Sequence, residues 1–260
     1  MLGFLRRYLP GAATLRGRYV EPFVGGGAVF FMLNPEQALL SDINPDLIDL
    51  YRGIRESPEV VWDRYCAFGS SKADYHRVRD ADRPELLVDR AARILFLNRT
   101  CFKGMWRHNQ EGKFNVGYGG QDRRWVIELD DLMTIADVLR TAKLRCCDFE
   151  EVVEECQLGD FIFADPPYRP GGKELTNGHY LGGQFSFEDY RRLASVLQNA
   201  KERGVLWALT TSAHPDIVAL FRGNRVIEVP RGTGRRPGIT VRNSGEVLIT
   251  SYGARGERRQ

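Results

Sequence analysis

The sequence predicts an α/β fold with a mainly parallel sheet and an inserted, mainly helical segment that carries a β-hairpin. A buried apolar run, residues 161–164, ends in the carboxylate Asp165, and open α/β sheets place ligand sites at such strand ends. Residues 18–31 indicate a short strand, a glycine-rich turn and the start of a helix. The strand–helix alternation stops after this region, which predicts a sheet domain of residues 1–52 and 143–260 and an inserted domain of residues 53–142.

Composition restricts the class of protein. The 260 residues are 27% charged and 43% hydrophobic, as in a soluble globular protein, and the net charge of +3 does not demand a polyanionic partner. The five cysteines form no C-x-x-C pair and there are four histidines, which disfavours a metal site and favours a reducing, cytoplasmic location. Because no run resembles a signal peptide or a membrane span, we expect a cytoplasmic location without membrane contact. We also expect a monomer.

The first half of the expected sheet carries two ligand-binding signals. Gly25 to Gly27 form the glycine turn, which lacks the G-x-G-x-x-G and Gly-Lys-Ser/Thr spacings of nucleotide-phosphate loops. The next strand, residues 37–41, ends in Asp42, and Asn44 is a good N-cap for a helix that begins at Pro45. Each signal alone is also explained by an ordinary turn or cap. Together they favour a ligand with a ribose, whose hydroxyls a strand-end acid can bind.

The inserted segment combines expected helices at residues 58–68 and 84–97 with an extended basic–aromatic stretch at residues 98–119. Glycines within this stretch favour a β-hairpin over a helix. The stretch interleaves cations, aromatics and amides: Arg99, Phe102, Lys103, Trp106, Arg107, Asn109, Lys113, Phe114, Asn115 and Tyr118. Cations contact phosphates, and arginine and asparagine can pair with base edges. An exposed hairpin explains one such cation, but the cluster, extended by Arg123, favours nucleic acid.

The chain then returns to the sheet through an expected helix at residues 131–142 and a strand at residues 144–147 that ends in Asp148 and Phe149. After the strand at residues 161–164 come Asp165, Pro166, Pro167 and Tyr168. The acid, the proline carbonyls and the aromatic face suit an exocyclic amine on a flat heterocycle. The alternative is a plain Pro-Pro turn.

The rest of the chain is expected to complete the sheet. We expect a loop at residues 169–184 and a helix from a capping box at Ser186 to Gly204. A strand at residues 205–211 and closing strands at 225–229 and 246–252 follow, with a loop at 231–236 and a polar tail at 255–260. His214, next to Pro215, is expected to cap a helix rather than to touch a substrate.

Three motifs in this order, Glu21-Pro22-Phe23-Val24-Gly25-Gly26-Gly27, Ser41-Asp42-Ile43-Asn44 and Asp165-Pro166-Pro167-Tyr168, resemble those of Dam-type N6-adenine-specific DNA methyltransferases. The resemblance implies a Rossmann-like, S-adenosylmethionine-dependent methyltransferase sheet with an inserted DNA-recognition domain. It also implies methyl transfer to the N6 amine of a flipped adenine in double-stranded DNA.

The resemblance further assigns roles to the matching residues. S-adenosylmethionine is expected at Glu21, Pro22, Phe23, Gly25, Gly27, Asp42, Asn44, Asp148, Phe149 and Asp165. The target adenine is expected at Asp165, Pro166, Pro167 and Tyr168. DNA is expected at Arg99, Phe102, Lys103, Arg107, Asn109, Lys113, Asn115, Tyr118 and Arg123, with Lys103 where the family usually has Asn.

One family motif, a Lys-Trp-x-Gly-Gly-Lys block, has no counterpart in these residues. The alternatives are therefore a shortened sequence, weak cofactor binding, or a DNA-binding relic without activity. Methylation of an RNA base or of a protein amide is a further alternative, which the basic–aromatic segment argues against.

Overall fold

The computed structural model describes residues 1–105, 107, 109, 113–120, 127–167, 185–230 and 245–253. The chain forms two compact units, one of Met1–Ile43 with Cys147–Gln260 and one of Asn44–Cys146. Both the mixed α/β class and the sheet predicted from the sequence are confirmed. The predicted domain boundaries at residues 52 and 143 stay a prediction. The predicted loops at residues 169–184 and 231–236 and the tail at 255–260 lie outside the described residues.

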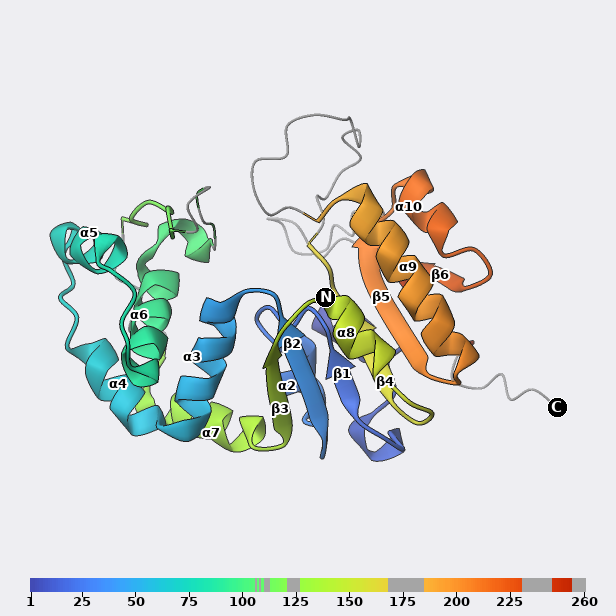
Figure 1. Ribbon diagram of the computed structural model, residues 1–260, viewed down its shortest axis with the longest axis horizontal. Helices are drawn as coiled ribbons and strands as arrows, with labels where there is room; N and C mark the ends of the chain where they lie inside the picture. The colour runs from blue at the N-terminus through green and yellow to red at the C-terminus, as the bar shows by residue number, and fades with distance from the viewer. Residues whose placement is uncertain are drawn as a thin grey trace. The chain divides into compact units, whose positions relative to one another are not determined.

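The first unit holds six strands of the sheet. They are β1 (Tyr19–Glu21), β2 (Ala38–Asp42), β4 (Phe161–Ala164), β5 (Leu206–Ser212), β6 (Arg225–Glu228) and β7 (Glu246–Thr250). Within this unit they lie in the order β2-β1-β4-β5-β7-β6 (Figure 1). β2, β1, β4 and β5 are parallel, and β7 is antiparallel to both β5 and β6. From β1 the chain passes to β2 on one side, and β4 and β5 then follow on the other side of β1. The strand order therefore reverses between β1 and β4, which is where such sheets open a crevice for ligands.

Helices cover both faces of this part of the sheet. They are α1 (Leu2–Leu5), α2 (Ala28–Leu33), α8 (Phe149–Glu154), α9 (Phe187–Glu202) and α10 (Pro215–Leu220). Figure 1 shows α8 and α9 side by side, and their apolar residues join Val20 and Ile162 in one core. Tyr19 and Phe161, one position earlier on the same strands, point to the opposite face, where Tyr19 stacks on Phe30 of α2. This alternation explains why the strands have no polar face.

The helix termini follow the sequence signals. Ser186 and Asp189 form the predicted capping box of α9, and Gly204 follows it with φ +83°. His214 caps α10 by accepting the Asp216 N–H at its Nδ1, which confirms the capping role expected for this residue. α1 is a four-residue helix near the N-terminus, and no sequence signal predicted it.

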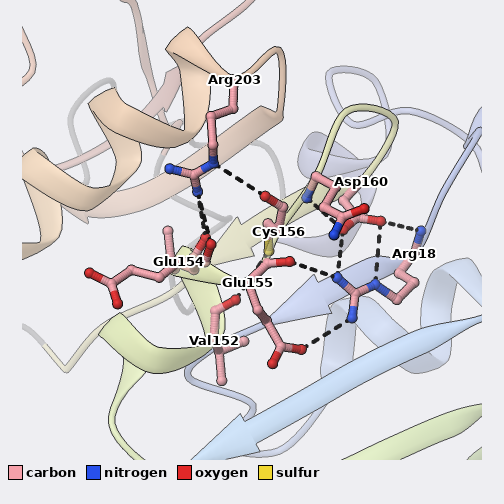
Figure 2. Close-up of polar contacts among 9 residues, drawn as sticks. Arg18, Val152, Glu154, Glu155, Cys156, Asp160 and Arg203 are labelled. Carbon is pink, nitrogen blue, oxygen red and sulfur yellow. Dashed lines mark hydrogen bonds and ion pairs between the residues drawn. The ribbon is translucent and has the colours of Figure 1, made fainter.

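A partly buried ion cluster ties the start of β1 to the start of β4 (Figure 2). The guanidinium of Arg18 donates to Asp160 Oδ2 at 2.8 Å and to Glu155 Oε1 at 3.1 Å, and the Arg18 N–H donates to Asp160 Oδ1 at 2.8 Å. Burial alone would raise the pKa of Asp160, but the hydrogen bonds from Arg18 outweigh it and hold that pKa below its ordinary value. Arg203 of the α9 C-terminus binds the carbonyls of Val153 and Cys156 beside this cluster.

The second unit is mainly helical. It contains α3 (Pro45–Glu56), α4 (Pro58–Cys66), α5 (Lys72–Asp80), α6 (Leu87–Thr100), a 3-10 turn (Phe102–Gly104), α7 (Leu129–Leu139) and β3 (Ala142–Cys146). α3 and α6 pack so closely that a Cβ added at Gly53 would lie 2.4 Å from that of Ala91. Buried Asp49 of α3 accepts from Arg83 at 2.6 Å and from Arg90 of α6 at 2.7 Å.

Two expectations for the second unit are corrected. α5 was missed because its sequence is highly polar; the capping box of Ser71 with Asp74 marks its start. α6 extends to Thr100, so residues 98–100 are helical and do not begin the hairpin. In the part of the chain that the structure describes, no helix is both long and apolar enough to cross a bilayer.

Candidate functional site

Parallel strands bring the expected site residues of the first unit to one edge of the sheet. Glu21 and Asp42 end β1 and β2, and Asp165 follows β4 directly. Pairing of Glu21 with Leu40 fixes the β1–β2 register. Since the strands run in the same direction, their carboxyl ends share this edge. The structure therefore brings three acids from distant parts of the chain together beside the point where the strand order reverses.

The glycine turn lies against the end of β2. Gly25 and Gly27 adopt φ +46° and +62°, which side chains rarely allow. The Gly25 N–H donates to Asp42 Oδ2 at 3.2 Å, so the glycine turn and the strand-end acid adjoin as expected. A Cβ added at Gly25 or Gly26 would meet no atom within 4 Å. The turn thus leaves its main chain open to a ligand.

Glu21 lies beneath this turn and is 2% exposed. Its Oε1 accepts the Tyr19 hydroxyl and, at 3.1 Å, the N–H of Phe30 in α2. Its Oε2 is buried and meets no donor among the described residues. Burial raises the pKa of Glu21 to about 8, against the smaller opposing effect of its two hydrogen bonds. Next to it, Pro22 is buried and Phe23 half-buried.

Asp165 occupies the first position after β4, and its Oδ1 accepts the Thr210 hydroxyl at 2.5 Å. Surrounding protein raises the pKa of Asp165, helped by the charge of Glu246, while the Thr210 hydrogen bond lowers it. One side of Asp165 faces solvent, and the net effect of its surroundings makes it a weaker acid than a free aspartic acid. Pro166 is buried and Pro167 exposed; among the described donors none is bonded to the Pro166 carbonyl. Tyr168 lies outside the described residues.

Asp148 and Phe149 are engaged within the protein. Asp148 caps α8 by accepting the Glu150 N–H at 2.9 Å. It also accepts from Arg192 at 2.8 Å. The buried ring of Phe149 lies between the Arg192 guanidinium, 4.8 Å from its centroid, and the Phe23 ring at 5.2 Å. Both residues therefore pack against Arg192 and join α8 to α9.

The basic–aromatic segment of the second unit is a hairpin in its described part. The Asn115 N–H donates to the Arg107 carbonyl at 3.0 Å, and the Asn109 N–H to the Lys113 carbonyl at 2.9 Å. These four residues are exposed, whereas Phe114 between them is buried. The Arg107 Nε donates to Asn115 Oδ1 at 2.9 Å, and Asn109 Oδ1 accepts the Lys113 N–H at 2.9 Å. Both amides thus brace the hairpin.

An exposed turn stands at the base of this hairpin. Phe102 is 47% exposed, and the Lys103 ammonium lies 5.2 Å from its ring centroid. Lys103 adopts φ +56°, a strained conformation that is more frequent at binding sites than elsewhere. The buried Tyr75 hydroxyl of α5 donates to the Val116 carbonyl at 2.8 Å, and its ring lies 5.4 Å from that of Tyr118.

Two expected ligand residues have other surroundings, and a third is not described. Arg99 is half-buried in the last turn of α6, and its Nε is buried with no partner in the described part of the chain. Asn44 caps α3, accepting the Asp46 N–H at 3.1 Å, as the sequence predicted. Arg123 lies outside the described residues.

Sequence reasoning missed two residues at the sheet edge of the first unit. Thr210 faces Asp165 from β5, and the register of the parallel strands was the information needed to find it. Ile43, directly after Asp42, is 73% exposed, which is unusual for an isoleucine. Among the described residues, no group of three His, Cys, Asp or Glu side chains could hold a metal ion.

Comparison with known proteins identifies the family. Residues 1–231 match the D12 class N6 adenine-specific DNA methyltransferase family. The chain is 32% identical over 246 residues to the type II methyltransferase M1.LlaDCHI of Lactococcus lactis subsp. cremoris, covering 90% of this chain and 86% of that protein. It is 31% identical over 227 residues to a DNA adenine methylase of Vibrio cholerae, covering 84% of this chain and 79% of that protein.

A third relative is the DNA N-6-adenine-methyltransferase of Escherichia phage P1, which is 38% identical over 220 residues. The match covers 83% of this chain but 28% of that longer protein. Because the family match extends over most of the chain, the resemblance seen in the motifs is confirmed. The chain belongs to the D12 class of N6 adenine-specific DNA methyltransferases.

Proposed function

We propose that the chain transfers a methyl group from S-adenosylmethionine to the N6 amine of an adenine that is flipped out of double-stranded DNA. Family membership supports the reaction, and the relatives' names, DNA adenine methylase among them, support DNA as the substrate. The main structural support for the site is Asp165, a strand-end carboxylate beside the point where the strand order reverses. It is followed by the Pro166 carbonyl, to which no described group donates.

The open edge of the first unit fits the cofactor. The uncovered main chain of Gly25 and Gly26 lets a ligand approach closely, and Asp42 can accept from ribose hydroxyls. The Oε2 of Glu21 is buried and has no partner among the described residues. A cationic amino group beside it would lower the pKa of Glu21, and the resulting carboxylate would accept from that group. The exposed side chain of Ile43 offers an apolar surface for a flat ring. When bound, S-adenosylmethionine supplies an electrophilic methyl group on a sulfonium sulfur.

The protein's task at the target is to prepare the adenine amine. That amine is a weak nucleophile because its lone pair is delocalised into the ring. We assign its two hydrogens to the Asp165 carboxylate and the Pro166 carbonyl. Accepting both favours a pyramidal nitrogen, whose lone pair can then point at the methyl group. An adenine in a duplex must leave the stack first, and Tyr168 is assigned the role of stacking on it.

DNA recognition is assigned to the hairpin of the second unit. Arg107 and Lys113 are exposed cations on a braced scaffold, so they can contact phosphates without a large loss of backbone entropy. Phe102 and Lys103 project from the strained turn beside it. Arg99, whose buried Nε has no partner among the described residues, is the remaining described cation of the expected DNA-binding set.

The decisive experiment is incubation with labelled S-adenosylmethionine and duplex DNA, followed by mapping of N6-methyladenine. We expect methyl transfer to duplex DNA and not to RNA or to a glutamine peptide. Asp165→Asn, which replaces an acceptor oxygen by a donor, should abolish transfer while DNA binding persists. Asp137→Asn, at an exposed position of α7, is the matched control and should keep activity. Full activity of Asp165→Asn would remove Asp165 from the site, and DNA binding without cofactor binding would favour the relic.

A further inference from the structure

We propose that Thr210 is a positioning residue for the Asp165 carboxylate: it holds one carboxylate oxygen and leaves the other for the adenine amine. The inference rests on the catalytic role proposed for Asp165. A carboxylate has two oxygens that exchange by rotation, and a freely rotating group presents the correct one to the substrate only part of the time. A fixed donor on one oxygen removes that freedom before substrate binds.

The register of β4 with β5 produces this contact. Ala164 pairs with Leu209, so the next residues on the two strands, Asp165 and Thr210, are neighbours across the parallel ladder. The Thr210 hydroxyl lies 2.5 Å from Asp165 Oδ1 and 3.4 Å from the Ala164 carbonyl, which makes the carboxylate the nearer acceptor. Because a hydroxyl has a single proton, this hydrogen bond uses it.

The surroundings hold Thr210 in this orientation. Thr210 is 2% exposed, and β-branching restricts its χ1 angle. The next residue, Thr211, points to the other face of the sheet, where its hydroxyl lies 3.3 Å from that of Tyr190 in α9. Thr211 therefore takes no part in the contact with Asp165, and because Thr210 is buried, water cannot readily replace its hydroxyl. This rigidity distinguishes Thr210 from a surface hydroxyl that rotates freely.

The hydrogen bond also has an electrostatic role. Among the described residues, the titratable groups that interact with Asp165 are acids and phenols on three elements: Glu21 and Tyr19 of β1, Tyr190 of α9 and Glu246 of β7. None of them favours the ionised carboxylate, whereas the Thr210 hydroxyl does, since it donates to the charged oxygen. Loss of that donor should therefore raise the pKa of Asp165 and reduce the ionised fraction at a given pH.

The test compares Thr210→Val, which keeps shape and removes the donor, with Thr210→Ser, which keeps the donor. Thr211→Val is the matched control on the same strand. Single-turnover methyl transfer to duplex DNA is measured across pH, together with DNA binding. Thr210→Val should slow transfer about 10- to 100-fold, as expected for loss of a hydrogen bond to a charged group. Its acidic limb should move to higher pH while DNA affinity stays unchanged, and Thr210→Ser and Thr211→Val should resemble the parent.

Several outcomes would overturn the inference. A Thr210→Val enzyme with parental rate and pH profile shows that the hydroxyl is not needed. Equal slowing of Thr210→Val and Thr211→Val with an unmoved acidic limb shows that β5 acts only structurally. If Thr210→Val does not fold, Thr210→Ala is subject to the same pH criterion. An active Asp165→Asn would instead refute the proposed site, whereas an inactive one beside a normal Thr210→Val refutes the role of Thr210 alone.

Discussion

Glu21 offers a quantitative test of the buried edge of the sheet through the substitution Glu21→Gln. The carboxyl is 2% exposed, and its Oε1 accepts the Tyr19 hydroxyl and the Phe30 N–H. A glutamine has the same shape and keeps an acceptor for both donors. The substitution therefore removes the ionisable group with little change in packing, and its effect reports the cost of ionising Glu21 inside the fold.

The magnitude follows from the pKa of Glu21, which burial raises from 4.5 to about 8 in the folded state. Above pH 4.5 the unfolded chain releases the proton, while the folded chain keeps it until about pH 8. In this window the folded state binds more protons, so the parent loses stability as the pH rises, by about 1.4 kcal/mol per pH unit. Between about pH 5 and about pH 8 the parent loses about 3 to 4 kcal/mol of stability in this way. Glu21→Gln does not lose this stability, because glutamine does not ionise.

The assay is urea unfolding of the parent and Glu21→Gln in the absence of cofactor and DNA. Each protein is measured near both ends of the pH window. The contributions of the other titrating groups then cancel in the difference between the variant and the parent. We expect the free energy of unfolding of Glu21→Gln, relative to the parent, to rise by about 3 to 4 kcal/mol from the lower to the higher pH. A difference that does not change with pH would refute the reasoning and show that Glu21 ionises in the fold as it does in the unfolded chain.

Two further predictions test the ion cluster and the hairpin. Gly17→Ala should destabilise the fold by about 1 to 3 kcal/mol in urea unfolding, because its Cβ would lie 2.7 Å from Asp160 Oδ1. Gly3→Ala, whose Cβ meets nothing within 4 Å, should be near neutral, and equal stability of the two variants would contradict the prediction. Arg107→Gln should weaken DNA binding. It should also reduce the magnitude of the slope of log K against log salt by about 0.9, the value expected from counterion release at one phosphate contact. Arg140→Gln, at the exposed arginine that follows α7, is the control, and an unchanged slope for Arg107→Gln would exclude a phosphate contact.

Local signals made much of the secondary structure predictable. Asn44 and Pro45 marked the start of α3, and Ser186 with Asp189 marked that of α9. Such caps act within one helical turn, so a few neighbouring residues contain the necessary information. α5 was missed because its apolar positions are too few for a periodic pattern, although Tyr75 and Val78 are buried. Helical periodicity alone could not locate that helix.

The sequence by itself determined the family, the order of the strands along the chain and the position of Asp165 at a strand end. These depend on motifs, apolar runs and turns, each contained within a short stretch. Only the tertiary structure decided which groups meet: Thr210 beside Asp165, Arg192 on Asp148, and a buried Oε2 on Glu21 that meets no described donor. These contacts join residues far apart in the chain, and strand register and helix packing set them. The protonation of Glu21 depends on them too, since the pKa of a carboxyl is fixed by its burial and neighbours rather than by its motif.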